Sequence, residues 1–109
     1  MTKIPAILFL LYFCFTAQAL AKSIHVTSGR NKPLTEAIHR ASAGDSIMVS
    51  GGVYTEGTIV VDKPLFLIGH DMPVLDGELK YEIMTITSDF VIIDGFQFRN
   101  SGSSSYEDI

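Results

Sequence analysis

The sequence predicts an all-β fold of the parallel β-helix type, with one α-helix capping its first turn. Three observations predict it: short β-branched runs separated by Gly, Pro, Asp and Ser, one amphipathic helix pattern before them, and a repeat at an offset of 26 residues. Repeats of about 20 to 50 residues are typical of stacked units, because one unit cannot bury its apolar face alone. We therefore expect successive turns of chain whose short strands stack on one another.

An export signal is expected before this domain. The chain has a basic start at Lys3, an apolar run over residues 4–15 and then small residues up to Ala21. The apolar run is shorter than the roughly 20 residues that span a bilayer, so no retained transmembrane segment is expected. Cleavage after Ala21 is favoured because Lys22 then opens the polar part of the chain. Cleavage after Ala19 also satisfies the small-residue rule.

The sequence therefore divides into a signal peptide over residues 1–21 and a periplasmic or secreted domain over residues 22–109. The second part contains no cysteine, so packing alone must stabilise it. Its seven Lys and Arg residues face twelve Asp and Glu residues, and they are not clustered. A nucleic-acid partner is disfavoured on that ground. Residues 101–109 resemble a loop leading toward another strand, so we expect only the first turns of the β-helix, incomplete at the C-terminus.

The first elements are a strand over residues 24–27, a turn over residues 28–31 and a short helix. Pro33 suits the first helical turn, and Gly44 suits the left-handed residue that ends a helix. A cap of this kind is needed because the open end of a stack exposes unpaired backbone groups and apolar side chains. The residues expected on the apolar face of the helix, spaced by three and four, are Leu34, Ala37, Ile38 and Ala41.

Five β-branched runs follow, and two of them define the repeat. Residues 60–69 align without gaps on residues 86–95, each copy holding a strand, a two-residue polar corner, a strand and a glycine. We expect Gly69 and Gly95 to let the backbone turn with a positive φ at a fixed corner. The five runs expected as strands are residues 47–49, 58–61, 65–68, 82–87 and 90–93.

The run from Leu34 to Glu56, with its Gly44-Asp45 pair and Tyr54, resembles the opening of pectin-lyase-like right-handed parallel β-helix proteins. Later motifs most resemble the NosD family, the periplasmic maturation proteins for nitrous-oxide reductase. The resemblance covers essentially all of residues 22–109. The motifs that carry it are Leu67-Ile68-Gly69, Pro73-Val74-Leu75-Asp76-Gly77 and Val91-Ile92-Ile93-Asp94-Gly95-Phe96, followed by Phe98 and Asn100-Ser101-Gly102.

The resemblance implies a right-handed coil, export to the periplasm and a non-enzymatic role in assembling the copper centre of the reductase. It implies the copper reductase and a membrane ABC transporter as partners, and copper as a possible ligand of the full-length protein. No catalytic residue is carried over. Asp45 and Glu56 recur in the superfamily opening and are therefore expected to be structural. Tyr54 is expected to pack its ring at the first corner, with its hydroxyl at the surface.

Histidine and methionine ligands suit copper, so a local metal site would need these residues close together in the sequence. Only His70 and Met72 lie within two residues of each other, which makes them the candidate metal pair. The competing interpretation is that both are exposed loop residues. Met48 and Met84 fall within apolar strand runs, where methionine is commonly core filler. No cofactor is predicted for residues 1–109.

Carboxylates also cluster, which bears on the alternative of a carbohydrate-active lyase or hydrolase, or a sugar-binding module, of the same fold. Asp71, Asp76 and Glu78 share one loop, and residues 107–108 form an acidic pair. Asp is a common turn former because it accepts backbone hydrogen bonds at bends. Catalysis by this segment is therefore not expected.

Overall fold

The computed structural model describes residues 20–102. The expected signal sequence up to residue 19 and the acidic pair at residues 107–108 lie outside the described residues. The favoured cleavage site after Ala21 lies inside them, directly before the first strand.

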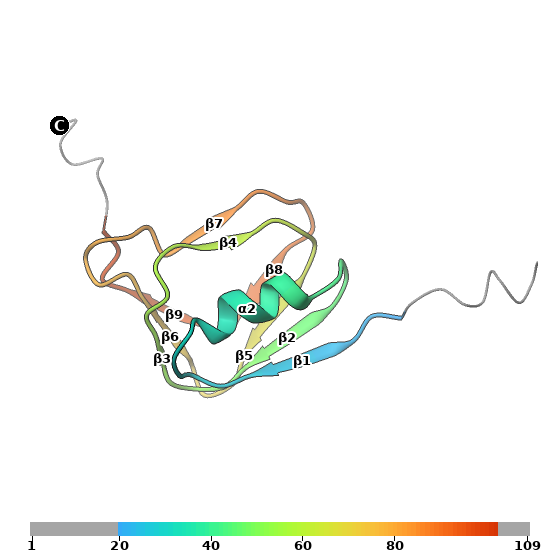
Figure 1. The fold of residues 1–109 in the computed structure, drawn as a ribbon, viewed down its shortest axis with the longest axis horizontal. Coiled ribbons are helices and arrows are strands. Elements are labelled where there is room, and N and C mark those ends of the chain that lie inside the picture. The colour runs from blue at the N-terminus through green and yellow to red at the C-terminus, as the bar shows by residue number, and fades with distance from the viewer. Residues whose placement is uncertain (1–19, 103–109) are drawn as a thin grey trace, which may run out of the picture.

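Three parallel sheets make up the fold, and the chain visits them in turn (Figure 1). The first sheet contains β1 (Ser23–Val26), β2 (Ser46–Val49), β5 (Phe66–Gly69) and β8 (Ile92–Asp94). The second contains β3 (Val53–Tyr54), β6 (Val74–Asp76) and β9 (Gln97–Arg99), and the third contains β4 (Ile59–Val61) and β7 (Met84–Ile86). The described residues confirm a fold of short parallel strands with one short helix.

Inward side chains stack in columns because strand partners lie in register from one turn of chain to the next. In the first sheet Ile24 pairs with Ile47, which pairs with Leu67, and all three are buried. Alternation along each strand sends the intervening residues outward. The last turn of chain is less covered than the others, since Ile86 and Phe98 are each 47% exposed.

The second sheet was not among the predicted strands. Its members β3, β6 and β9 have only two or three residues and one inward position each, at Tyr54, Leu75 and Phe98. They lie beside Gly, Pro and polar residues rather than within apolar β-branched runs like those that predict β4 and β8, which also have three residues. They form because parallel neighbours supply their hydrogen bonds, for example from the Val74 nitrogen to the Gly52 carbonyl at 2.8 Å.

The repeat offset of 26 residues is correct for one strand pair and wrong for the other. Phe66 pairs with Ile92, as the offset requires. Val61 pairs with Ile86, an offset of 25. The extra residue lies in the connection from β7 to β8, where Phe90 has φ 59° and is 84% exposed. As a result β8 lies further along the chain than predicted: it begins at Ile92 rather than at residue 90.

The two corner glycines serve different purposes. Gly95 has φ 85°, as expected for a left-handed corner, whereas the prediction of a positive φ at Gly69 is wrong. Gly69 ends β5 and is needed for close packing, because a Cβ there would collide with the Gly95 carbonyl oxygen and with the Pro73 ring. A Cβ at Gly95 would in turn lie 2.6 Å from the Gly69 oxygen.

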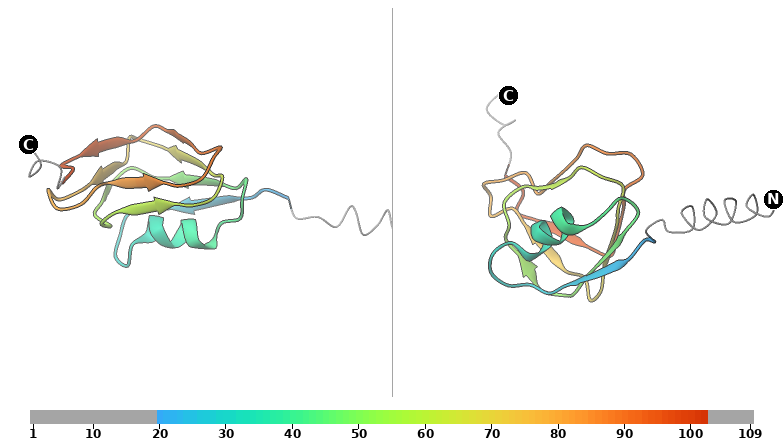
Figure 2. Two further views of the ribbon diagram at one scale, coloured as in Figure 1. Left: turned by 90° about the horizontal axis from the view of Figure 1, so that it is seen from above. Right: turned by 45° about the vertical axis from the view of Figure 1, so that its right-hand side comes forward.

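Helix α2 (Pro33–Arg40), the one helix within residues 20–102, lies across one end of the stacked strands (Figures 1 and 2). It contacts β1, β2 and β4. Its predicted apolar face is buried, and Glu36, His39 and Arg40 are exposed. No helix within residues 20–102 is long and apolar enough to cross a membrane.

The prediction that Gly44 ends the helix is wrong. The helix ends at Arg40, and Ala41 has the extended conformation with φ −73° and ψ 153°. Gly44 lies in the following turn with φ 91°, where its nitrogen donates a hydrogen bond to the Pro64 carbonyl at 2.7 Å. That bond joins the turn to the next coil instead of closing the helix.

Both ends of α2 are held by side chains from the following turn of chain. At the N-terminus, the Glu56 carboxylate accepts hydrogen bonds from the Leu34 nitrogen at 2.9 Å and the Thr35 nitrogen at 2.8 Å. At the C-terminus, the Lys63 ammonium donates to the carbonyls of Ile38 at 3.0 Å and Ala41 at 2.8 Å. Each charge has the sign that the helix dipole favours at that end.

Replacing the Glu56 carboxylate tests its role as the cap of the N-terminus of α2. Glu56→Gln puts an amide group where three donors meet, because the Thr35 hydroxyl also donates to Glu56 at 2.7 Å. We expect the free energy of unfolding to fall by about 1–3 kcal/mol, the cost of leaving buried donors unsatisfied. Urea unfolding of the two proteins measures it. Glu36→Gln, on the exposed face of the same helix, should change stability by less than about 0.5 kcal/mol, and an equal loss in both variants would contradict the capping role.

Candidate functional site

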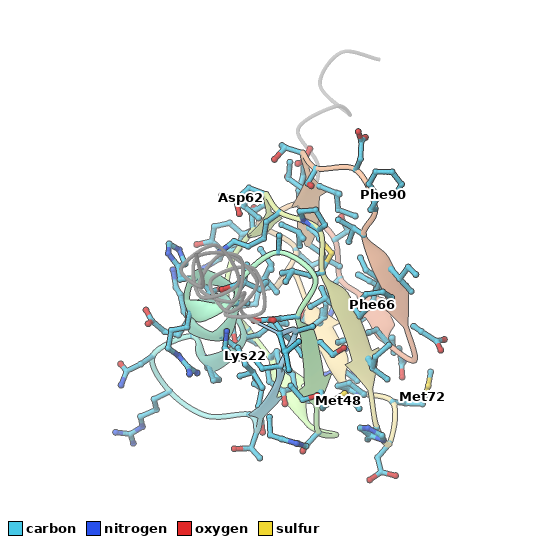
Figure 3. The ribbon with its side chains drawn as sticks, turned by 90° about the vertical axis from the view of Figure 1, so that its right-hand side faces the viewer. Lys22, Met48, Asp62, Phe66, Met72 and Phe90 are labelled. Atoms are coloured by element: carbon cyan, nitrogen blue, oxygen red, sulfur yellow. The ribbon has the colours of Figure 1, made fainter. Side chains whose placement is uncertain are left out.

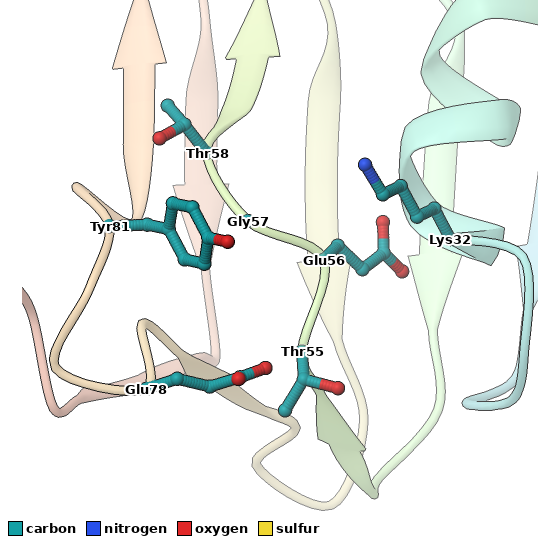
Figure 4. A pocket seen from close by; sticks show the side chains of 7 residues that line it. All are labelled: Lys32, Thr55, Glu56, Gly57, Thr58, Glu78 and Tyr81. Carbon is teal, nitrogen blue, oxygen red and sulfur yellow. The ribbon is translucent and has the colours of Figure 1, made fainter.

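A groove of about 400 Å³ lies at the turn between the second and third sheets. In Figure 4, Tyr81 and Glu78 lie on one side of it and Lys32 on the other, with the segment from Thr55 to Thr58 forming the floor. We call this the Tyr81 groove. Its lining residues are Lys32, Thr55, Glu56, Gly57, Thr58, Glu78 and Tyr81.

The side chains of the Tyr81 groove differ in what they can offer a ligand. Glu56 is only 3% exposed and its two oxygens already accept the hydrogen bonds that cap α2. Lys32 and Glu78 are exposed and have left-handed backbones, with φ 53° and 56°. Tyr81 is 43% exposed. The groove can therefore present an aromatic face, an ammonium, a carboxylate and two threonine hydroxyls to a polar ligand.

A second, smaller hollow of about 100 Å³ lies where α2 meets β4. It is lined by Ile38, His39, Val60, Asp62 and Lys63. The Lys63 ammonium within it is bound to the helix carbonyls. This hollow belongs to the helix-capping arrangement.

Asp45 is the centre of a buried polar cluster. Its side chain is 1% exposed and accepts hydrogen bonds from the Lys22 backbone nitrogen at 2.9 Å, the Lys22 ammonium at 2.7 Å and the Ser42 nitrogen at 2.8 Å. The Lys22 side chain, followed by the backbone donors, lowers the pKa of the Asp45 carboxyl from 3.8 to about 2. As expected, Asp45 has a structural role: it joins the start of β1 to the turn before β2.

Asp76 has a similar role on the second sheet. Its carboxylate accepts a hydrogen bond from the Glu78 nitrogen at 2.8 Å, which forms a turn, and it pairs with the Arg99 guanidinium at 3.3 Å. The Glu78 backbone bond is the main cause of the lowered pKa of Asp76. The interpretation of this acid as a turn former is consistent with these contacts.

The candidate metal pair lies in an exposed loop. His70 and Met72 are both exposed, Met72 by 55% of its surface, and Met72 has φ 47°. Across residues 20–102, no three or more His, Cys, Asp or Glu side chains are grouped as a metal ion would require. Met48, on β2, points outward rather than into the core.

Tyr54 packs inward at the first corner, but its hydroxyl is not at the surface as predicted. The residue is 2% exposed, and its hydroxyl donates to the Ser50 carbonyl at 2.7 Å. Burial, with a smaller effect from the nearby Glu56 charge, raises the pKa of the Tyr54 hydroxyl. The ring heads the inward column of the second sheet.

The groove residues were missed because they come from three separate segments of chain. Lys32 precedes the helix, Thr55 and Thr58 flank β3 and β4, and Glu78 and Tyr81 follow β6. Of the lining residues, only Glu56 was noted, as a structural acid, and Glu78, as part of an acidic loop. No local spacing could have joined these side chains, because stacking of successive turns brings them together.

The low pKa of Asp45 predicts a pH dependence of stability. The folded-state pKa lies below the ordinary value, so ionised Asp45 stabilises the fold above about pH 4, and this contribution is lost as pH falls from about 4 through 2. Asp45→Asn should therefore unfold at lower urea concentration than the parent at pH 7, with the difference shrinking toward pH 2. Asp89→Asn, at an exposed position, is the control. A difference that persists unchanged at pH 2 would contradict this role.

The chain was compared with protein-family models, curated proteins and solved structures, and none of these matches it. The residues and contacts of the chain itself are therefore what bear on its function.

Proposed function

We propose that the described residues are the first coils of a right-handed parallel β-helix in an exported accessory protein, which assists maturation of the copper centre of nitrous-oxide reductase by binding rather than by catalysis. The succession of three parallel sheets with a helix across one end supports the architecture. The NosD-like motifs support the role, and with it a periplasmic location and a membrane ABC transporter as a further partner.

The observation that carries a binding role is an apolar patch on the outward side of the first sheet. Strand register places Met48 beside Ile68, and Phe66 beside Ile92, across β2, β5 and β8. Phe66 is 40% exposed and Ile92 is 50% exposed. We call these four residues the outer apolar face. Two of its residues, Met48 and Phe66, are labelled in Figure 3.

Protein partners commonly bind contiguous exposed apolar surface of this kind. Polar residues border the outer apolar face, with Ser46 beside Phe66 and Asp94 beside Ile68. The buried acids Asp45 and Glu56 have their oxygens engaged in structural hydrogen bonds, which leaves them unsuited to acid–base chemistry. We assign the outer apolar face to the reductase polypeptide.

Removing the exposed apolar groups should impair reductase maturation. In the organism that carries the gene, the double variant Phe66→Ser and Ile92→Ser should weaken partner binding about tenfold or more, since a few residues at the centre of an interface carry most of its binding energy and truncating one of them costs about 2 kcal/mol or more. We expect purified nitrous-oxide reductase from that strain to contain less copper and to reduce less nitrous oxide. Copper content per reductase and the rate of nitrous-oxide consumption by cells measure the effect.

Val60→Ser is the matched control, because Val60 points outward from the third sheet and is 49% exposed. It should leave copper content unchanged. A strain that lacks the gene yet makes fully copper-loaded reductase would contradict the maturation role. Full loading in the double variant alone would contradict only the assignment of the outer apolar face.

The Tyr81 groove favours a second candidate, a sugar-binding module. Saccharides bind where an aromatic ring can pack on the sugar face and where polar groups both donate to and accept from hydroxyls. Tyr81 supplies the ring, Glu78 accepts, Lys32 donates, and the threonine hydroxyls do both. The volume of about 400 Å³ falls in the range of small-molecule sites.

Calorimetry with a neutral cello-oligosaccharide and an oligogalacturonate tests this candidate. Tyr81→Ala and Glu78→Gln should each weaken saccharide binding about tenfold, as the loss of roughly 1–2 kcal/mol implies. Phe90→Ala removes an exposed aromatic ring outside the groove and should have no effect. Absence of heat with both saccharides would eliminate the sugar-binding alternative.

A further inference from the structure

The start of the folded domain coincides with the favoured cleavage site. Leu20 is 89% exposed and Ala21 is also exposed. The first backbone bond to the neighbouring strand is made at Lys22, whose carbonyl accepts from the Ser46 nitrogen at 2.9 Å. The bond between Ala21 and Lys22 therefore lies at the boundary between exposed chain and sheet.

At that boundary the Lys22 backbone nitrogen is 2.9 Å from Oδ1 of Asp45. The other carboxylate oxygen is taken by the Lys22 ammonium at 2.7 Å and the Ser42 nitrogen at 2.8 Å. The Asp45 side chain is 1% exposed, whereas the Lys22 side chain is 53% exposed. Asp45 thus carries a negative charge out of contact with solvent, with one of its oxygens bound only by a neutral amide.

We infer that hydrolysis of the Ala21–Lys22 bond during export converts this amide into an α-ammonium that forms an ion pair with Asp45 and locks β1 to the turn before β2. This rests on the export that the proposed function includes. The oxygen of a water molecule bonds to the Ala21 carbonyl carbon as the bond from that carbon to the Lys22 nitrogen breaks. Ala21 then ends in a carboxylate, and the two protons of the water are taken up by the Lys22 nitrogen, which becomes an ammonium. The peptidase of the exporting membrane performs the cleavage, and no redox partner is needed.

Two physical reasons make the new group stabilising. An α-amino group with a pKa near 8 is charged at neutral pH, and its positive charge adds a Coulomb attraction to the hydrogen bond that the neutral amide already donates to the Asp45 carboxylate. The carboxyl is ionised under these conditions, because its pKa is about 2. Cleavage after Ala19 would leave the amide at Lys22 uncharged, so only the cut after Ala21 produces the ion pair.

Exporting the full chain with its own leader, and isolating the periplasmic product, tests the inference. N-terminal sequencing and intact mass should show a start at Lys22. A variant with one glycine inserted between Ala21 and Lys22 moves the ammonium away while keeping the Lys22 nitrogen as an amide. Its product should melt about 3 °C or more below the parent. In an Asp45→Asn background the same insertion should lower the melting temperature by less than 1 °C, because the partner charge is gone.

Each other result overturns the inference in a recognisable way. A start at Leu20, or equal melting temperatures for parent and insertion variant, would overturn the ion pair while leaving export intact. An equal loss on insertion in the parent and in the Asp45→Asn background would show that the glycine acts through something other than Asp45. An uncleaved chain retained in the cytoplasm would overturn both this inference and the proposed export.

Discussion

The capping of both ends of α2 by the Glu56 carboxylate and the Lys63 ammonium is the constraint on which the stacked strands depend. A parallel stack exposes backbone hydrogen-bonding groups and the ends of its inward columns at its first strand. Helix α2 covers that end, and it is positioned by a carboxylate at its N-terminus and an ammonium at its C-terminus. Because both charges come from the following turn of chain, the cap and the first coil must form together.

Three acids of the described residues join one turn of chain to another. Asp45 links the start of β1 to the turn before β2, Glu56 holds the helix, and Asp76 links β6 to Arg99 on β9. Charges used in this way are not available for chemistry on a ligand. Function is therefore more readily placed on surfaces, namely the outer apolar face for a protein partner and the Tyr81 groove for a small polar ligand.

The sequence predicted structural side chains better than functional ones. The structural roles expected for Asp45 and Glu56 agree with their hydrogen bonds, and the apolar face of the helix was named residue by residue. The candidate pair His70 and Met72 lies in an exposed loop. The Tyr81 groove was not predicted, because its residues lie up to about fifty positions apart and only the stacking of coils brings them into one place.

Local patterns in the sequence determined the helix, the strands of the first and third sheets and the approximate repeat, because each depends on a pattern that neighbouring residues carry. The tertiary structure alone decided the second sheet, the change of register from 26 to 25 residues and the end of the helix at Arg40. These features depend on hydrogen bonds between turns of chain about twenty to twenty-six residues apart. Such bonds form only after the coils have stacked, so no local pattern records them.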